Sequence, residues 1–277
     1  MHNKRGGVLK KAIGVIDSGV GGLTVAYELM RQLPNEQLIY VGDTLRCPYG
    51  PRPQHEVIQY TLEMVRFLVN KNIKMIVVAC NTATAFALDT LKKEFEIPVI
   101  GVIQPGARAA IKSTKNNEIG VIGTEGTIKS NAYPEALKAI NSELQVTTLA
   151  CPTFVPMVEK GITSGEKAFT IVEEALLPLQ RTNIDTLVLG CTHYPLLEKI
   201  IGNVMGEKVK IISSSEETAR ETSAVLEVHG LLQKEARLIE HHFYTTGDLQ
   251  LFKKISRLIF NEQITDLKNV TIDKIVM

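Results

Sequence analysis

Two stretches of the chain decide its fold: KMIVVACNTAT at residues 74–84 and DTLVLGCTHYP at residues 185–195. Each contains an unbroken apolar run that is too short for a helix, includes β-branched residues and ends on a cysteine, Cys80 or Cys191. Small polar residues follow each cysteine before the next helical pattern begins. The pattern indicates two buried parallel strands, each with a thiol at its carboxyl end. Ligands of open α/β sheets bind at these strand ends, so we expect both thiols to face one site.

The surroundings of the two cysteine strands also repeat. A strand and turn at 13–22 matches 119–127, and Cys47-Pro48 matches Cys151-Pro152. Matched positions lie about 104 to 111 residues apart, and such nearly constant offsets indicate a duplicated α/β unit with a pseudo-twofold axis. We therefore predict an α/β fold with two similar domains and mostly parallel sheets. The first domain is expected at 1–103 plus 214–277, with the tail packed back on the first unit, and the second at 104–213.

The remaining elements follow from hydrophobic periodicity. A helix is expected to begin at Thr82 or Thr84, directly after the first cysteine strand. Two tail helices are expected at 216–232 and near 249–259. Further strands are expected at 12–17, 37–43, 97–102, 118–123, 209–213 and 243–246.

Composition excludes several classes of function. The 31 Lys and Arg residues balance 30 Asp and Glu residues, which offers no electrostatic footprint for nucleic acid or a membrane surface, so a small-molecule substrate is favoured. The basic N-terminus 1–11 is not followed by the apolar core of a signal peptide, and no apolar run is long enough to span a bilayer. We expect a cytoplasmic protein.

Cysteine and histidine spacing argues against disulfides and metal ligation. Its four cysteines lie far apart with no Cys-x-x-Cys pair, so neither a disulfide framework nor a ribbon-type zinc site is indicated. His241 and His242 are neighbours at the start of the strand predicted around 243–246, and neighbouring side chains on a strand point to opposite faces. We predict no metal site.

The turn at 18–22 is rich in glycine and follows the strand 12–17. A nucleotide loop stays open as an interpretation, but the spacing is not Gly-x-Gly-x-x-Gly and no residue that would hold a ribose is evident. The alternative is that these glycines let backbone N–H groups approach a smaller anion beside Asp17.

A facing pair of thiols can invert a carbon centre without a cofactor. One thiolate removes a proton from one face while the other thiol returns a proton to the opposite face, so the pair titrates as a coupled unit. Holding a thiol of ordinary pKa as thiolate near neutral pH costs about 2 kcal/mol, so nearby groups must help. Asp17 at the first strand tip and His193, two residues after Cys191, are placed to move protons.

Other cysteine chemistries fit less well. A cysteine hydrolase needs one nucleophile and a base, and Cys80 has no histidine near it in sequence, although a spatial neighbour stays open. A second, symmetry-matched thiol would be redundant in such an enzyme. A pyridoxal phosphate racemase needs a Schiff-base lysine in a phosphate cup, and no lysine stands out for that role.

These residues resemble a known family, the cofactor-independent glutamate racemases within the wider aspartate/glutamate racemase group. The combination of Cys-Asn-Thr with Gly-Cys-Thr-His is highly specific. The matching stretches run from 12 almost to the C-terminus: 16–25, 42–44, 46–52, 79–84, 150–152, 190–195 and 243–248.

The resemblance implies an active site in the cleft between two α/β domains, no cofactor, and often a homodimer. It implies that Cys80 handles the α-proton of D-glutamate with the help of Asp17. It implies that Cys191 handles that of L-glutamate with the help of His193 and Glu159, whereas Cys47 and Cys151 stay structural. The positions it places around the substrate are Asp17, Ser18, Pro48, Tyr49, Gly50, Asn81, Thr82, Thr124, Thr192 and His193.

The resulting hypothesis is an isomerase that interconverts L- and D-glutamate and supplies D-glutamate for peptidoglycan; the pathway comes from the resemblance alone. One rival is the same mechanism acting on another acid, chiefly aspartate. A rival of another class is an amino-acid-binding protein with the same cleft and no catalysis.

Overall fold

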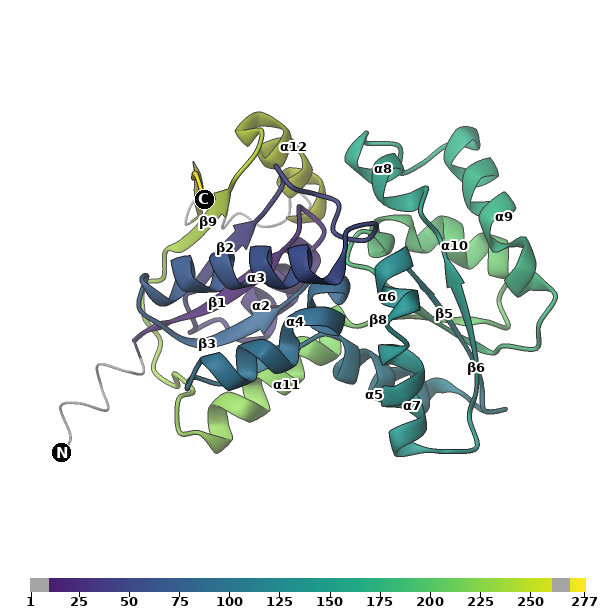
Figure 1. The fold of residues 1–277 in the computed structure, drawn as a ribbon, viewed down its shortest axis with the longest axis horizontal. Helices are drawn as coiled ribbons and strands as arrows, with labels where there is room; N and C mark the ends of the chain where they lie inside the picture. Colours follow the sequence, from purple (N-terminus) through teal and green to yellow (C-terminus); the bar gives the residue numbers. More distant parts are fainter. Residues whose placement is uncertain (1–9, 261–269) are drawn as a thin grey trace.

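The computed structural model describes residues 10–260 and 270–277, and the basic stretch 1–9 lies outside the described residues. The strands form two sheets, both entirely parallel, which lie side by side in Figure 1. The predicted α/β class is confirmed, with parallel pairing throughout the described strands. The first sheet contains β1 (Ala12–Asp17), β2 (Leu38–Gly42), β3 (Ile73–Val78), β4 (Val99–Gly101), β9 (His241–Thr245) and β10 (Val270–Lys274). The second contains β5 (Glu118–Gly123), β6 (Gln145–Ala150), β7 (Thr186–Gly190) and β8 (Lys210–Ser213).

The two sheets share one strand order. The first runs β10-β9-β2-β1-β3-β4 and the second β6-β5-β7-β8, so β2-β1-β3-β4 corresponds to β6-β5-β7-β8. The repeat seen in the sequence is therefore a repeat of topology. Cys80 follows β3 and Cys191 follows β7, which places both cysteines at equivalent strand ends.

Helices cover both faces of each sheet (Figure 1). Those beside the first sheet are α2 (Leu23–Gln32), α3 (Gln54–Val69), α4 (Asn81–Glu94), α11 (Ser215–Val228) and α12 (Leu249–Phe260). Those beside the second are α5 (Ile103–Ser113), α6 (Glu125–Lys129), α7 (Ala132–Ile140), α8 (Phe154–Glu159), α9 (Glu166–Gln180), the 3₁₀ helix η1 (Tyr194–Leu197) and α10 (Glu198–Met205).

The C-terminal tail returns to the first sheet. Strand β9 pairs with β2, and Phe243 and Phe252 share a buried core with Tyr40 and with Leu226 of α11. The tail thus packs on the first unit, as expected, because its apolar side chains share one buried core with those of α2, β1 and β2. The domain boundaries at 103/104 and 213/214 stay a prediction.

Two local expectations were wrong, and one strand was missed. The helix after the first cysteine begins at Asn81, not at Thr82 or Thr84, because the Cys80 side chain itself accepts from the Ala83 N–H and so acts as the N-cap. Helix α11 ends at Val228 rather than at 232. Two residues after that end, Gly230 adopts a positive φ of 64°, a conformation that stops a helix. Strand β10 was not predicted. None of the helices within 10–260 and 270–277, the described residues, is long and apolar enough to cross a membrane.

Candidate active site

The carboxyl ends of both sheets border one pocket. It is lined by Ser18, Pro48, Tyr49, Gly50, Cys80, Asn81, Thr82, Thr124, Val155, Cys191, Thr192 and His193. Its open space is about 10 Å³, the room of about one water molecule, so an amino acid can enter only if the walls move apart. A wider cleft of about 600 Å³ between α2, α5, β8 and α11 contains neither Cys80 nor Cys191 and so cannot host thiol chemistry.

Cys80 lies buried at the N-terminus of α4. Its Sγ accepts a hydrogen bond from the Ala83 N–H at 3.4 Å, and its thiol donates to Ser18 Oγ at 3.5 Å. Burial, with a smaller contribution from the negative charge of Asp17, raises the pKa of Cys80 to about 12, and the Ala83 N–H opposes the rise. The thiol is therefore protonated near neutral pH, and forming its thiolate there costs about 7 kcal/mol.

Asp17 ends β1 and joins the two halves of the pocket. Its Oδ2 accepts from the Gly19 N–H at 2.8 Å, and its Oδ1 accepts from the Thr192 hydroxyl at 3.0 Å. The N–H of Gly19 in the glycine-rich turn thus binds Asp17 rather than an external anion. Burial raises the pKa of Asp17, while the charge of His193 and these hydrogen bonds oppose the rise. A carboxyl group whose pKa is moved toward neutrality is suited to exchanging protons.

The glycine-rich turn also lets the second sheet approach the first. A Cβ atom at Gly21 would lie 2.5 Å from Thr192 Oγ1 and 2.8 Å from the backbone nitrogen of His193. Glycine is needed at this position because any side chain would push the loop after Cys191 away from Asp17.

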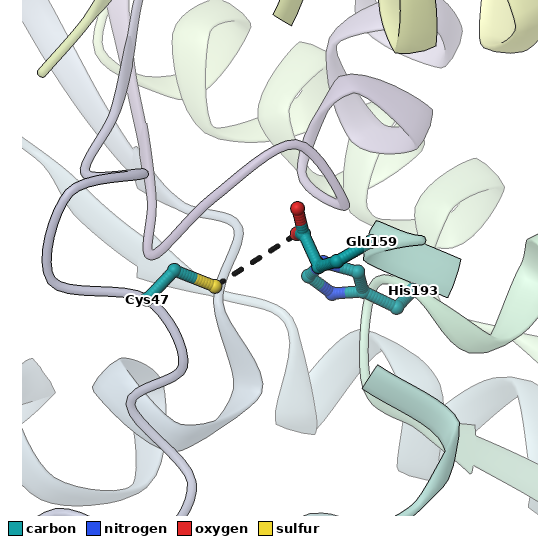
Figure 2. Close-up of side chains that lie close together, drawn as sticks. All are labelled: Cys47, Glu159 and His193. Carbon is teal, nitrogen blue, oxygen red and sulfur yellow. Dashed lines mark hydrogen bonds and ion pairs between the residues drawn. The ribbon is translucent and has the colours of Figure 1, made fainter. Parts of the chain in front are cut away.

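Cys191 faces an imidazole–carboxylate pair. Its Sγ lies 3.9 Å from His193 Nδ1, and His193 Nε2 lies 2.6 Å from Glu159 Oε1 at the end of α8. Figure 2 shows the Glu159 carboxylate against the His193 ring. Burial opposes protonation of His193, but its hydrogen bonds with Cys191 and Glu159 outweigh burial and raise its pKa well above 6.5. A protonated imidazole can donate to both neighbours, so the trio can pass a proton between the thiol and the half-buried carboxylate.

Donors for a carboxylate line the opposite wall. The hydroxyls of Thr82 and Thr124 lie 2.8 Å apart, which joins α4 to the N-terminus of α6. The hydroxyl of Tyr133 donates to Asn81 Oδ1 at 2.8 Å. The other end of that amide, Asn81 Nδ2, is buried and has no hydrogen-bond partner within the part of the chain that the structure describes. A buried donor of this kind is costly until a ligand accepts from it.

The pocket corresponds to a known family. The family model for Asp/Glu/hydantoin racemases matches residues 13–222. The chain belongs to this racemase family. A protein of Oceanobacillus iheyensis called glutamate racemase is 65% identical over 255 residues, 92% of this chain and 93% of that one. A glutamate racemase structure from Bacillus anthracis is 48% identical, with a TM-score of 0.88 over 96% of this chain and 98% of that one. One from Francisella tularensis in complex with D-glutamate is 33% identical, with a TM-score of 0.88 over 97% and 98%.

Most residues singled out from the sequence of this racemase lie in the pocket wall, and the exceptions are informative. Asp17 and Glu159 lie behind the lining and reach it through Thr192 and His193. Val155 and Tyr133 were not anticipated. A valine on a helix carries no chemical signal, and the contact of Tyr133 with Asn81 spans 52 residues of sequence.

The two remaining cysteines differ from each other in their surroundings. The Cys151 side chain lies in the core beneath the second sheet, and its thiol points to the Leu149 carbonyl at 4.0 Å. The half-buried Cys47 side chain points instead toward Glu159, with Sγ 3.8 Å from Oε1 (Figure 2). Burial raises the pKa of Cys47 well above 9.0, and the nearby charge of Glu159 adds to this effect. In the histidine pair at 241–242, the buried His241 has a structural role, because its Nδ1 accepts from the Leu38 N–H of β2 at 3.1 Å.

Proposed function

We propose that this protein is a glutamate racemase that interconverts L- and D-glutamate by proton transfer at the α-carbon, with Cys80 and Cys191 as the two bases and no cofactor. The observation that carries the proposal is the pair of buried thiols at equivalent ends of β3 and β7, which border one pocket from different sheets. Its relatives support glutamate as the substrate, since the proteins of Oceanobacillus iheyensis and Listeria innocua called glutamate racemase are 65% and 55% identical to this chain.

In the L-to-D direction the Cys191 thiolate removes the α-proton. The Cα–H bond breaks as an S–H bond forms at Cys191, and the Cys80 S–H bond breaks as a new Cα–H bond forms on the opposite face. Turnover leaves Cys191 protonated and Cys80 ionised. The D-to-L direction exchanges these roles.

The thiols need different help to reach these states. His193 and Glu159 accept or return a proton beside Cys191, and Asp17 does so on the side of Cys80. The substrate ammonium group, bonded to the α-carbon that both thiols flank, adds a positive charge near each of them and so lowers the cost of the Cys80 thiolate. Bound glutamate thereby supplies part of the stabilisation that the free pocket lacks.

The polar wall would hold the substrate carboxylates. The amide of Asn81 and the hydroxyls of Thr82 and Thr124 converge on the pocket, and backbone N–H groups at the start of α4 add donors. Ser18 and Thr192 lie beside the thiols, and Pro48, Tyr49 and Gly50 close the pocket from the proline-rich loop. Tyr49 contributes its ring and backbone, because its hydroxyl donates to Asp43 at 2.5 Å.

The biological setting is proposed from the likeness to glutamate racemases alone. It comprises a cytoplasmic homodimer that supplies D-glutamate for peptidoglycan. Light scattering of the purified full-length protein would test the dimer, and a monomer mass at every concentration would contradict it.

The deciding experiment follows proton exchange in the metal-free protein. L-Glutamate is incubated with it in deuterated water, while optical rotation and deuterium at the α-carbon are recorded, and L-aspartate is run in parallel. Loss of rotation with deuterium in the product, on glutamate and without added cofactor, is the expected result. Faster turnover of aspartate would show that aspartate, not glutamate, is the substrate. Absence of exchange on both acids would favour the alternative of an amino-acid-binding protein without catalysis.

A further inference from the structure

Cys47, Glu159 and His193 bring three metal-ligating atoms together at the edge of the pocket. Cys47 Sγ, one carboxylate oxygen of Glu159 and one ring nitrogen of His193 all lie within 4.8 Å of one another. The residues come from the proline-rich loop, from α8 and from the loop after β7, and Figure 2 shows Cys47 facing the other two. We propose that these three side chains form a site for a thiophilic divalent cation, Zn²⁺ in the first place, and that its occupation inhibits the racemase.

The donor set has the chemistry of a zinc site. Thiolate, imidazole and carboxylate are the ligands that Zn²⁺ prefers, and three protein ligands leave a fourth position for water or a substrate group. Hard cations such as Mg²⁺ and Ca²⁺ prefer oxygen ligands, so the thiol selects against them. Nothing in the sequence spacing predicts this site, because Glu159 lies 112 residues from Cys47 and 34 from His193.

The present distances are close to those that a cation requires. Ligand atoms of a tetrahedral zinc centre, with bonds of about 2.0–2.3 Å, lie about 3.4–3.6 Å apart. Cys47 Sγ and Glu159 Oε1 are 3.8 Å apart, and His193 Nε2 and the same oxygen are 2.6 Å apart. The histidine–glutamate separation must widen by about 1 Å, which a small rotation of the half-buried Glu159 side chain supplies, and the sulfur and the imidazole nitrogen already lie within 4.8 Å of each other.

The structure also leaves room and access for a cation. A Cβ atom at Gly19 would lie 3.0 Å from Cys47 Sγ and 3.3 Å from Glu159 Oε1, so the glycine keeps open the space between two of the ligands. The Glu159 side chain is 25% exposed and Cys47 is half-buried, so the cation can arrive from solvent. Prolines at 48, 51 and 53 hold the loop that carries Cys47.

Inhibition follows from the atoms that the cation occupies, and this step rests on the proposed function. A cation on His193 Nε2 replaces the hydrogen bond to Glu159 and prevents that nitrogen from carrying a proton. Cys191 would then lose the imidazole–carboxylate pair beside it. Binding displaces the Cys47 thiol proton to solvent, and no redox step is involved.

Binding is tested without reference to activity. Metal-free full-length protein is titrated with Cd²⁺, whose bond to a thiolate absorbs in the ultraviolet, and with Zn²⁺ by calorimetry. We expect one site, with Zn²⁺ affinity falling by about tenfold or more in Cys47→Ser, since losing even a hydrogen-bond partner of a metal ligand costs about 10–100-fold. Cys151→Ala removes another non-catalytic thiol and is the matched control that should bind as the wild type does. Unchanged absorption and affinity in Cys47→Ser would overturn the site.

Activity is tested on the same variants. Zn²⁺ should inhibit the wild type and Cys151→Ala reversibly, with recovery on chelation, and inhibit Cys47→Ser only at about tenfold higher concentration or above. Binding through Cys47 with undiminished racemisation would overturn the inhibitory role. Failure of the metal-free protein to exchange α-protons would instead contradict the proposed function, while the binding titration would still decide whether the site exists.

Discussion

Cys80 and Cys191 occupy equivalent ends of equivalent strands, but their surroundings differ. Cys80 is the N-cap of α4 and contacts the Ala83 N–H and the Ser18 hydroxyl. Cys191 precedes the 3₁₀ turn η1 and faces the pair formed by His193 and Glu159. The repeated topology supplies two matched thiols, and the residues after each cysteine give them different means of handling protons. The two thiols are therefore placed symmetrically in the pocket, whereas the groups that contact each thiol differ.

The largest effects are expected from removing either thiol. Cys80→Ala and Cys191→Ala should each lower racemisation by about a thousandfold or more, because each loses the base or acid on one face of the α-carbon. The remaining thiol still exchanges protons on its own face. In deuterated water, Cys80→Ala should exchange the α-proton of L-glutamate only, and Cys191→Ala that of D-glutamate only, as measured by mass spectrometry of the separated enantiomers.

Cys151→Ala is the control for that experiment, since it removes a buried thiol outside the pocket. Near-normal turnover in Cys80→Ala would end the two-base scheme. Exchange of the same enantiomer in both alanine variants would contradict the assignment of one thiol to each face.

Smaller effects are expected from the supporting groups. Asp17→Asn and His193→Asn should each lower kcat/KM by about 10²–10⁴-fold, the usual contribution of a general acid or base. Because L- and D-glutamate have equal free energies, kcat/KM must fall equally in the two directions, so rates alone cannot separate the two roles. Primary deuterium isotope effects can. His193→Asn should increase the isotope effect measured with α-deuterated L-glutamate more than the one measured with α-deuterated D-glutamate. Asp17→Asn should do the reverse.

Equal increases for both enantiomers in both variants would show that the two groups support the pocket as one unit. The hydrogen bond from Thr192 to Asp17 is the contact that could couple them. Thr192→Val, which removes that hydroxyl and keeps the shape, would then reproduce part of the change.

A weaker effect on activity is expected from the hydrogen bond between Tyr133 and Asn81, which joins the two halves of the molecule at the substrate-binding wall. Tyr133→Phe removes the hydroxyl that fixes Asn81 Oδ1, so the amide is free to turn its nitrogen away from the pocket. Losing one such hydrogen bond is worth about 1 kcal/mol, which corresponds to a rise in KM of about fivefold. Steady-state kinetics would measure it, with Tyr60→Phe as the control because that hydroxyl lies on α3 outside the pocket. An equal rise in the control would show that the loss is not specific to Asn81.

A structural feature could be predicted from the sequence when the residues that determine it are close together along the chain. The cysteine strands and their polar termini could be predicted because an apolar run and the residues after it are local. The links from Asp17 to Thr192 and from Tyr133 to Asn81 could not, because they join residues 175 and 52 positions apart and depend on how the sheets dock. The start of α4 was misplaced because a cysteine is an unusual N-cap, and the helix geometry alone reveals that its sulfur accepts from Ala83.

The last prediction concerns stability rather than turnover. It compares how the two cysteine strands are anchored at their starts. When they are aligned on Cys80 and Cys191, Lys74 corresponds to Asp185. Lys74 is buried, with Nζ 2.6 Å from Glu36 Oε2 and 2.8 Å from the Leu231 carbonyl, whereas Asp185 accepts from the backbone of Lys115 and Asn116 near the surface. Burial lowers the pKa of Lys74, and Glu36 opposes this, so the pair depends on both charges.

Lys74→Ala leaves the Glu36 carboxylate buried without its cation and should lower the free energy of unfolding by about 3–5 kcal/mol. Asp185→Ala should lower it by about 1 kcal/mol, because water can replace the lost acceptor. Denaturant unfolding would measure both changes. The folded fraction of each variant should racemise at close to the wild-type rate, since neither side chain lines the pocket. Equal losses of stability would mean that the two strands are anchored alike, and the asymmetry would then be confined to the residues that follow the cysteines.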